Sequence, residues 1–309
     1  MQNPNIGKGL RKTPVDKRDK KFRHNRLFGS MNLSLLPENF YDPEYPKIKN
    51  QRDTDFCTGF ASAAVSEDQE GVELSPEFPF AMAKEISGED IETWGADLRT
   101  LCKVHKQIGA IEESESPYHV GEKPRDFLAD PKNWQEVKQK AIKHQKKSFT
   151  PVHTGPYTAF DNIRVALWQH RDDHDKKSVF TGVDWFPSMD HVSGGLIPNR
   201  RFGTDKGDGN PAGHAIKIRW KGWKTIAGTV YLIIQNSWGD GVGDRGLYYI
   251  PAIPFNQLSA SYGAFMFIDE TPEDIQKKIS LLSQLVNLLQ QLLFILQKSG
   301  RDVLHALGL

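Results

Sequence analysis

Residues 51–71, "QRDTDFCTGFASAAVSEDQEG", contain Cys57, one of only two cysteines in the 309-residue chain. Gln51 stands six positions before the cysteine, and small and apolar residues follow it at helical spacing as far as Gly71. This pattern predicts a helix that ends at the glycine. A lone thiol is most often an inert core group. It becomes a nucleophile only as a thiolate, beside a base or a positive charge.

A candidate base lies far along the chain, in "GNPAGHAIKIRW" (209–220), where His214 separates a Gly-rich loop from a predicted strand. A catalytic imidazole needs an acceptor to fix its second nitrogen. Asn236 stands at the end of the next predicted strand, in "LIIQNSWGDGVGDRGLYYI" (232–250), and its amide oxygen is suited to that role. Trp238 follows and is expected to cover the pair against water.

The charge of the chain is balanced overall, at a formal +1, which argues against nucleic acid as an obligatory partner. Residues 1–30, however, carry nine Lys/Arg against two acidic residues. A run of this kind is most often a solvated flexible arm, and binding to an acidic surface is the minority interpretation.

Two cysteines cannot form a disulfide framework, so a reducing compartment is expected. No apolar segment follows the N-terminal positive charges within the first 30 residues, so no secretory signal is visible. We therefore expect a cytoplasmic protein. The second cysteine, Cys102, lies in "DLRTLCKVHKQIG" (97–109), which predicts a helix with Gly109 as its cap and a buried, unreactive thiol.

The chain divides into three sections: a basic N-terminal extension (1–35), a mixed central section (36–270) and a C-terminal amphipathic helix (271–309). The first half of the central section is mostly helical by pattern, and the second half reads as strands. Helices followed by strands predict an α+β fold with two packed subdomains and a cleft between them.

The C-terminal section contains a charge-free stretch, residues 279–297, with leucines at heptad spacing. Self-association or docking on the catalytic domain is the first interpretation of this stretch. Contact with a membrane surface, and so peripheral membrane association, is the second. A membrane-spanning helix is the third, and the interspersed Ser, Gln and Asn residues make it the weakest.

Several blocks occur in the order found in papain-like cysteine peptidases, from about residue 35 to 252. "KNQRDTDFCTGFAS" (49–62) resembles the Gln-x5-Cys segment of that family, and "GHAIKI" (213–218) is similar to its histidine strand. "NSWGDGVGDRGLYYI" (236–250) resembles its Asn-Ser-Trp-Gly block. Thr54 replaces a cysteine usual in secreted members, so the likeness is to a disulfide-free, bacterial or phage-type member.

The resemblance implies catalytic roles for four residues. Cys57 would be the nucleophile at the N-terminus of a helix, where the dipole helps to lower its pKa. His214 would form an ion pair with the thiolate, and Asn236 would orient the imidazole. The side chain of Gln51 and the backbone N–H of Cys57 would form the oxyanion hole. No cofactor and no metal are expected.

The resemblance also implies a papain-like fold, with a helical half, an antiparallel, barrel-like half and the added C-terminal helix. Gly95 and Trp238 would contact a protein or peptide substrate, the former by backbone pairing. The implied function is a cysteine endopeptidase working through a thioester acyl-enzyme. Two alternatives remain: a papain-fold regulatory or binding protein with an occluded cleft that acts through its C-terminal helix, and the same chemistry on a non-protein amide or in transpeptidation.

Overall fold

The computed structural model describes residues 8–14, 16, 32–90, 92–118, 134–173, 175–269, 284 and 288–291. The chain forms two compact units, residues 1–269 and 270–309. Most of the predicted C-terminal helix, including most of residues 279–297, lies outside the described residues; residues 284 and 288–291 are helical. Within the described part of the chain, no helix has the length and apolar character needed to cross a membrane.

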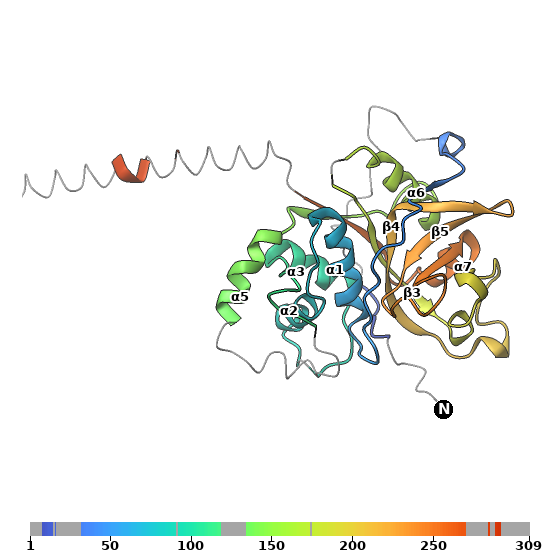
Figure 1. Ribbon diagram of the computed structural model, residues 1–309, viewed down its shortest axis with the longest axis horizontal. Coiled ribbons are helices and arrows are strands. Elements are labelled where there is room, and N and C mark those ends of the chain that lie inside the picture. The colour runs from blue at the N-terminus through green and yellow to red at the C-terminus, as the bar shows by residue number, and fades with distance from the viewer. Residues whose placement is uncertain are drawn as a thin grey trace, which may run out of the picture. The chain divides into compact units, whose positions relative to one another are not determined.

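Helices make up one half of the larger unit (Figure 1). They are α1 (Cys57–Glu70), α2 (Glu77–Ser87), α3 (Leu98–Gln107) and α5 (Trp134–Ala141). Helix α1 ends as its sequence predicts: Gly71 is left-handed, with φ 71°, and its N–H donates to the carbonyl of Glu67. Helix α3 begins at an N-cap, Asp97, whose side chain accepts from the N–H of Thr100.

The other half is an antiparallel sheet in the order β2-β7-β3-β4-β5-β6, with β1 paired to β4. The strands are β1 (Phe40–Tyr41), β2 (Ser148–Pro151), β3 (Val179–Trp185), β4 (Ala212–Ile226), β5 (Thr229–Gln235), β6 (Leu247–Pro251) and β7 (Ala264–Ile268). Helices α6 (Ala159–Gln169) and α7 (Ala252–Leu258) lie in the same half (Figure 1). The α+β architecture predicted from the sequence is confirmed.

Strand β4 is the longest in the sheet and pairs with β1, β3 and β5. Its first half pairs with β3 from Ala212 to Ile218, and its second half pairs with β5. The β5 register shifts between Ile218 and Trp223, which marks a bulge that bends the strand.

Strand β4 and helix α1 meet in a shared core. Cys57 and Phe60 of the helix pack there with Ala215 of β4 and Phe180 of β3. An ion pair joins Lys217 Nζ of β4 to Oδ1 of Asp68, in the last turn of α1, at 2.7 Å. The two halves of the unit are therefore held together along α1.

The sequence patterns predict α1 and α3, a helix over residues 161–170 that matches α6, and strands over 177–183, 214–223, 229–238 and 246–251 that match β3 to β6. They missed α2, α5 and α7 and the short strands β1, β2 and β7. Helix α3 ends slightly earlier than predicted, since its cap is Ile108 and Gly109 follows with φ 106°. Cys102 lies in α3 and is fully buried, as expected.

The expectation of a solvated N-terminal arm is wrong for part of residues 1–35. Lys8 and Leu10 are only 4% and 6% exposed, and Leu10 forms a parallel bridge with Ala96. The backbone of this segment finds hydrogen-bond partners on both halves of the unit, which a count of charges does not reveal.

Candidate active site

The thiol of Cys57 lies at the first residue of α1, where the sequence placed it. The side chain is fully buried, and two backbone N–H groups point at its sulfur: Gly9 at 3.2 Å and Ala215 at 3.5 Å. Burial raises the pKa of the thiol to about 12, and these two N–H groups act in the opposite direction. In this state of the molecule the sulfur is therefore protonated.

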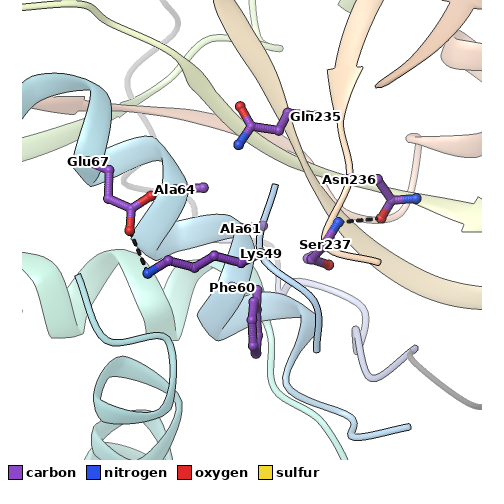
Figure 2. A pocket seen from close by; sticks show the side chains of 9 residues that line it. Lys49, Phe60, Ala61, Ala64, Glu67, Gln235, Asn236 and Ser237 are labelled. Atoms are coloured by element: carbon purple, nitrogen blue, oxygen red, sulfur yellow. Dashed lines mark hydrogen bonds and ion pairs between the residues drawn. The ribbon is translucent and has the colours of Figure 1, made fainter. Parts of the chain in front are cut away.

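The imidazole of His214 is fixed by one strong contact. Its Nε2 lies 2.7 Å from Oδ1 of Asn236, and the backbone N–H of Ser237 donates to the same oxygen at 2.7 Å. Figure 2 shows the second of these bonds. Because the shared atom accepts from a backbone N–H, it is the amide oxygen, and Nε2 must donate. The neutral ring then leaves Nδ1 unprotonated, and this buried nitrogen has no hydrogen-bond partner among the described residues.

Two tryptophans enclose the imidazole. The ring of Trp238 stacks on His214 with centroids 4.5 Å apart and planes 24° apart. Trp185 meets the same imidazole edge-on at 5.6 Å. Burial lowers the pKa of His214 to about 3, against the opposing effect of the Asn236 hydrogen bond. The covering role predicted for Trp238 agrees with this geometry, whereas a contact with substrate stays a prediction.

Gln51 is fully buried and held from several directions. Its Nε2 donates to the carbonyl of Thr54 at 2.9 Å, and its Oε1 accepts from the hydroxyl of Ser237. Its backbone N–H donates to the carbonyl of Ser237 at 2.8 Å. Ser237 thus bonds both Gln51 and Asn236. Sequence reasoning assigned it no role, although it lies inside the Asn-Ser-Trp-Gly block that was singled out.

Gly95 lies on the helical wall of the site in the left-handed region, with φ 61°. Its N–H donates to a carboxylate oxygen of Asp55 at 2.5 Å, and its carbonyl accepts from Nζ of Lys84. The next residue, Ala96, makes the backbone pairing, since its N–H donates to the carbonyl of Gly9 at 3.0 Å. Pairing of the Gly95 backbone with a substrate stays a prediction.

A small pocket adjoins Asn236 on the other side of these groups (Figure 2). Its walls come from α1 and from the end of β5, with Lys49 paired to Glu67 at 2.7 Å at one side. Among the described residues there is no group of three or more His, Cys, Asp or Glu placed to hold a metal ion.

Comparisons with known proteins agree with this architecture. No protein-family model matches the chain. A protein of Blomia tropicalis described as a cysteine protease is 23% identical over 227 residues, which are 70% of this chain. The chain covers only 61% of that relative's length.

Two solved structures are similar in fold. Xylellain, a cysteine protease from Xylella fastidiosa, has a TM-score of 0.67 and 19% identity, covering 88% of this chain and 99% of its own. A procathepsin B from Trypanosoma congolense has a TM-score of 0.61 and 16% identity, covering 85% and 87%. The resemblance drawn from the sequence is thus confirmed at the level of architecture: the chain has the fold of the papain-like cysteine proteases.

Proposed function

We propose that the protein is a cysteine peptidase that hydrolyses peptide bonds in protein or peptide substrates. One observation carries the proposal: the imidazole of His214 is held by Asn236 through Nε2 at 2.7 Å, while Nδ1 has no hydrogen-bond partner. The next residue of β4, Ala215, has its N–H 3.5 Å from the sulfur of Cys57. An imidazole held in one tautomer near a thiol is what general-base activation of sulfur requires.

The first half of the reaction forms a thioester. Nδ1 of His214 takes the proton of the Cys57 thiol, and the thiolate attacks the carbonyl carbon of the scissile bond. The carbonyl oxygen becomes an oxyanion, for which the Gln51 amide and the Cys57 backbone N–H are the donors. The tetrahedral intermediate collapses, and the imidazolium gives its proton to the departing amine nitrogen. The amine leaves, and the acyl group stays on sulfur.

The second half restores the enzyme. His214 takes a proton from a water molecule, whose oxygen attacks the thioester carbon, and the same oxyanion donors act again. The carbon–sulfur bond then breaks, the acid product leaves, and the imidazolium returns its proton to the thiolate. Asn236 keeps the ring in the orientation needed for both proton transfers, because its Oδ1 accepts the hydrogen bond from Nε2–H.

A thiol-directed epoxide or vinyl-sulfone probe, combined with a protein-hydrolysis assay, tests this function. In a Gly9→Ala protein, where the added Cβ would clash with the carbonyl oxygen of Asp55 and displace the residues that cover the thiol, we expect the probe to label Cys57 and to label it far more slowly when His214→Ala is added. His170→Ala is the matched control, since that histidine is bonded to Asp173 at the surface. Hydrolysis that persists in Cys57→Ala, or equal labelling with and without His214, would contradict the mechanism.

The alternative function, a regulatory protein with an occluded cleft, is favoured by the residues around Gly9 that cover the thiol. A binding protein, however, has no need of a buried His–Asn pair and a fixed glutamine beside the same thiol. The hydrolysis assay separates the two functions, because a regulatory protein would leave the substrate intact in every variant.

A further inference from the structure

Asp190 lies on the sheet wall of the site, at the end of the short 3-10 helix Pro187–Met189 that follows β3. The indole N–H of Trp185 donates to its Oδ1 at 2.7 Å, and the same indole meets the imidazole of His214 edge-on at 5.6 Å. The carboxylate is therefore held in one orientation, one ring away from the candidate base. Its side chain is 33% exposed, which leaves it accessible to another charged group.

A second carboxylate fixes the loop that carries Asp190. Asp208 is 1% exposed and accepts from both terminal nitrogens of Arg200. It also accepts from the hydroxyl of Ser188 at 3.0 Å and from the N–H of Gly203 at 2.9 Å. A buried carboxylate with this many donors stabilises one loop conformation. The position of Asp190 is therefore determined by the body of the protein.

A cation occupies the space between Asp190 and Trp238. The Nζ atom of Lys8 lies 3.8 Å from Oδ2 of the carboxylate and 5.8 Å from the centroid of the indole ring. The lysine side chain is only 4% exposed. Its burial lowers the pKa of the amine, and the charge of Asp190 acts in the opposite direction. A carboxylate and an aromatic face are the groups that stabilise an ammonium withdrawn from water.

This cation belongs to a residue next to the reacting sulfur. Gly9 directly follows Lys8, and its N–H lies 3.2 Å from the sulfur of Cys57. The space between Asp190 and Trp238 is thus within reach of a side chain one residue away from whatever group contacts the nucleophile. An interaction at this distance affects the reaction rate of a bound peptide as well as its affinity.

Glu89, an acidic group on the helical wall, differs from Asp190 in its neighbours. Arg11 pairs with Glu89 through two contacts of 2.7 Å, but Nζ of Lys84 also lies 3.6 Å from the same carboxylate. Lys84 therefore still neutralises part of that charge when another chain is in the site. Among the described residues, Lys8 is the only cation within ion-pair distance of Asp190. When Lys8 is displaced, Asp190 loses its ion-pair partner and attracts another cation.

We propose that Asp190 and Trp238 form a cation site that selects substrates with a lysine or arginine within one or two residues of the scissile bond. The inference rests on the proposed peptidase function and adds the substrate class to it. A substrate with a neutral side chain at this place leaves the charge of Asp190 unpaired beside an apolar ring, which disfavours it. The attraction does not depend on the direction of the peptide, because it acts between two charges.

The test is steady-state kinetics with pairs of peptides that differ only in Lys or Gln, placed in turn at each of three positions on either side of the cleaved bond. The protein is full-length Gly9→Ala, in which the added Cβ would lie 2.0 Å from the carbonyl oxygen of Asp55 and displace residues 8–13. At one position we expect kcat/KM to be about tenfold higher for the Lys peptide. Asp190→Asn keeps an acceptor for Trp185 and should bring this ratio to about one, and Asp190→Lys should favour a Glu peptide instead.

Asp172→Asn is the matched control, because it removes one acidic charge from a side chain that is 79% exposed and paired with Arg171. Its Lys-to-Gln ratio should equal that of the parent. A second parent, Lys8→Ala with Arg11→Ala, removes the ion pairs of residues 8–13 and decides the question if circular dichroism shows that Gly9→Ala is not folded. Equal kcat/KM for Lys and Gln at every position, or a ratio that survives Asp190→Asn, would overturn the proposal.

A binding measurement separates the cation site from the peptidase function. The same peptides carry fluorescein, and fluorescence anisotropy gives their affinity for the Gly9→Ala protein with Cys57→Ala added. Tighter binding of the Lys peptide that Asp190→Asn abolishes, without hydrolysis by any protein, supports the cation site and contradicts the peptidase. Hydrolysis at equal rates for both members of every pair supports the peptidase and contradicts the cation site. Neither hydrolysis nor a difference in binding contradicts both.

Discussion

Two buried histidines, one in each half of the unit, differ in what surrounds them. His105 in α3 and His214 in β4 are both fully buried, and burial lowers the pKa of each to about 3. Both ring nitrogens of His105 are without a hydrogen-bond partner, and the ring lies against Phe267 with centroids 4.7 Å apart. His214 has one nitrogen held by Asn236 and the other unoccupied.

The difference shows that burial and a shifted pKa do not identify a base. A general base needs a fixed tautomer and a nucleophile within reach. His214 has its Nε2 held by Asn236, and the N–H of the next residue, Ala215, lies 3.5 Å from the sulfur of Cys57. Among the described residues, His105 has neither kind of contact. The contrast can be tested by substitution at both positions.

The largest expected effect is the loss of hydrolysis in His214→Ala. We expect kcat to fall by about 10⁶-fold, the scale seen when the histidine of a catalytic triad is removed. His105→Leu should stay within about twofold of the parent, because its ring has no role in proton transfer. Steady-state kinetics in a Gly9→Ala background, where the added Cβ would clash with Asp55 and displace the residues that cover the thiol, make both effects visible. A similar loss in His105→Leu would remove the distinction between the two histidines.

Gln51→Ala is expected to have the next largest effect. Loss of one oxyanion donor lowers kcat by about 10²- to 10³-fold while the substrate KM changes little. The pKa seen in the thiol alkylation profile should stay unchanged, since the amide acts on the transition state. A variant with normal kcat and a raised KM would show that Gln51 binds the ground state instead.

Asn236→Ala is expected to have a smaller effect than His214→Ala or Gln51→Ala. It should lower kcat by about 10- to 100-fold, because the stacked ring of Trp238 still restricts the imidazole. Asn236→Asp should restore part of the activity, since a carboxylate also accepts from Nε2–H. Recovery by the aspartate variant separates orientation of the ring from a general loss of packing. Equal activity in the two variants would argue against an orienting role.

The smallest effect concerns stability at acid pH. A histidine whose folded pKa lies below its unfolded value of 6.5 favours unfolding as the pH falls from about 6.5 toward 3. At pH 5, this costs about 2 kcal/mol for one such histidine. His105→Leu should therefore lose less stability than the wild type between pH 7.5 and pH 5. Urea unfolding at both pH values measures the difference, and parallel losses would contradict the lowered pKa.

The sequence predicted those elements whose pattern is local. Helix α1 and its glycine cap, and the strands β3 to β6, follow from spacing and β-branched content. Helix α2 was missed because "EFPFAMAKEIS" (77–87) is apolar on almost every face, and most of it is buried. The strand β7 was missed because its partners, β2 and β3, lie far away in the chain.

The sequence likewise predicted some residues of the candidate site and missed the contacts between distant parts of the chain. Cys57, His214, Asn236 and Gln51 could be named from motifs in sequence order. The bond between Ser237 and Gln51 joins residues 186 positions apart, and no spacing rule predicts it. The position of residues 8–13 was not predicted, because a basic composition predicts a solvated segment. Its position depends instead on backbone hydrogen bonds and on Gly9, which has no Cβ to clash with Asp55.

The distances along the chain also determine when each part of the site is made. Gly9 precedes Cys57 by 48 residues, whereas Ala215, the neighbour of the base, follows it by 158 residues. At about 5–20 residues per second, the thiol leaves the ribosome on the order of ten seconds before the imidazole strand. The covering segment is therefore present throughout the interval in which the site is incomplete. A newly made chain thus holds the segment that covers the thiol before it holds the strand that carries His214.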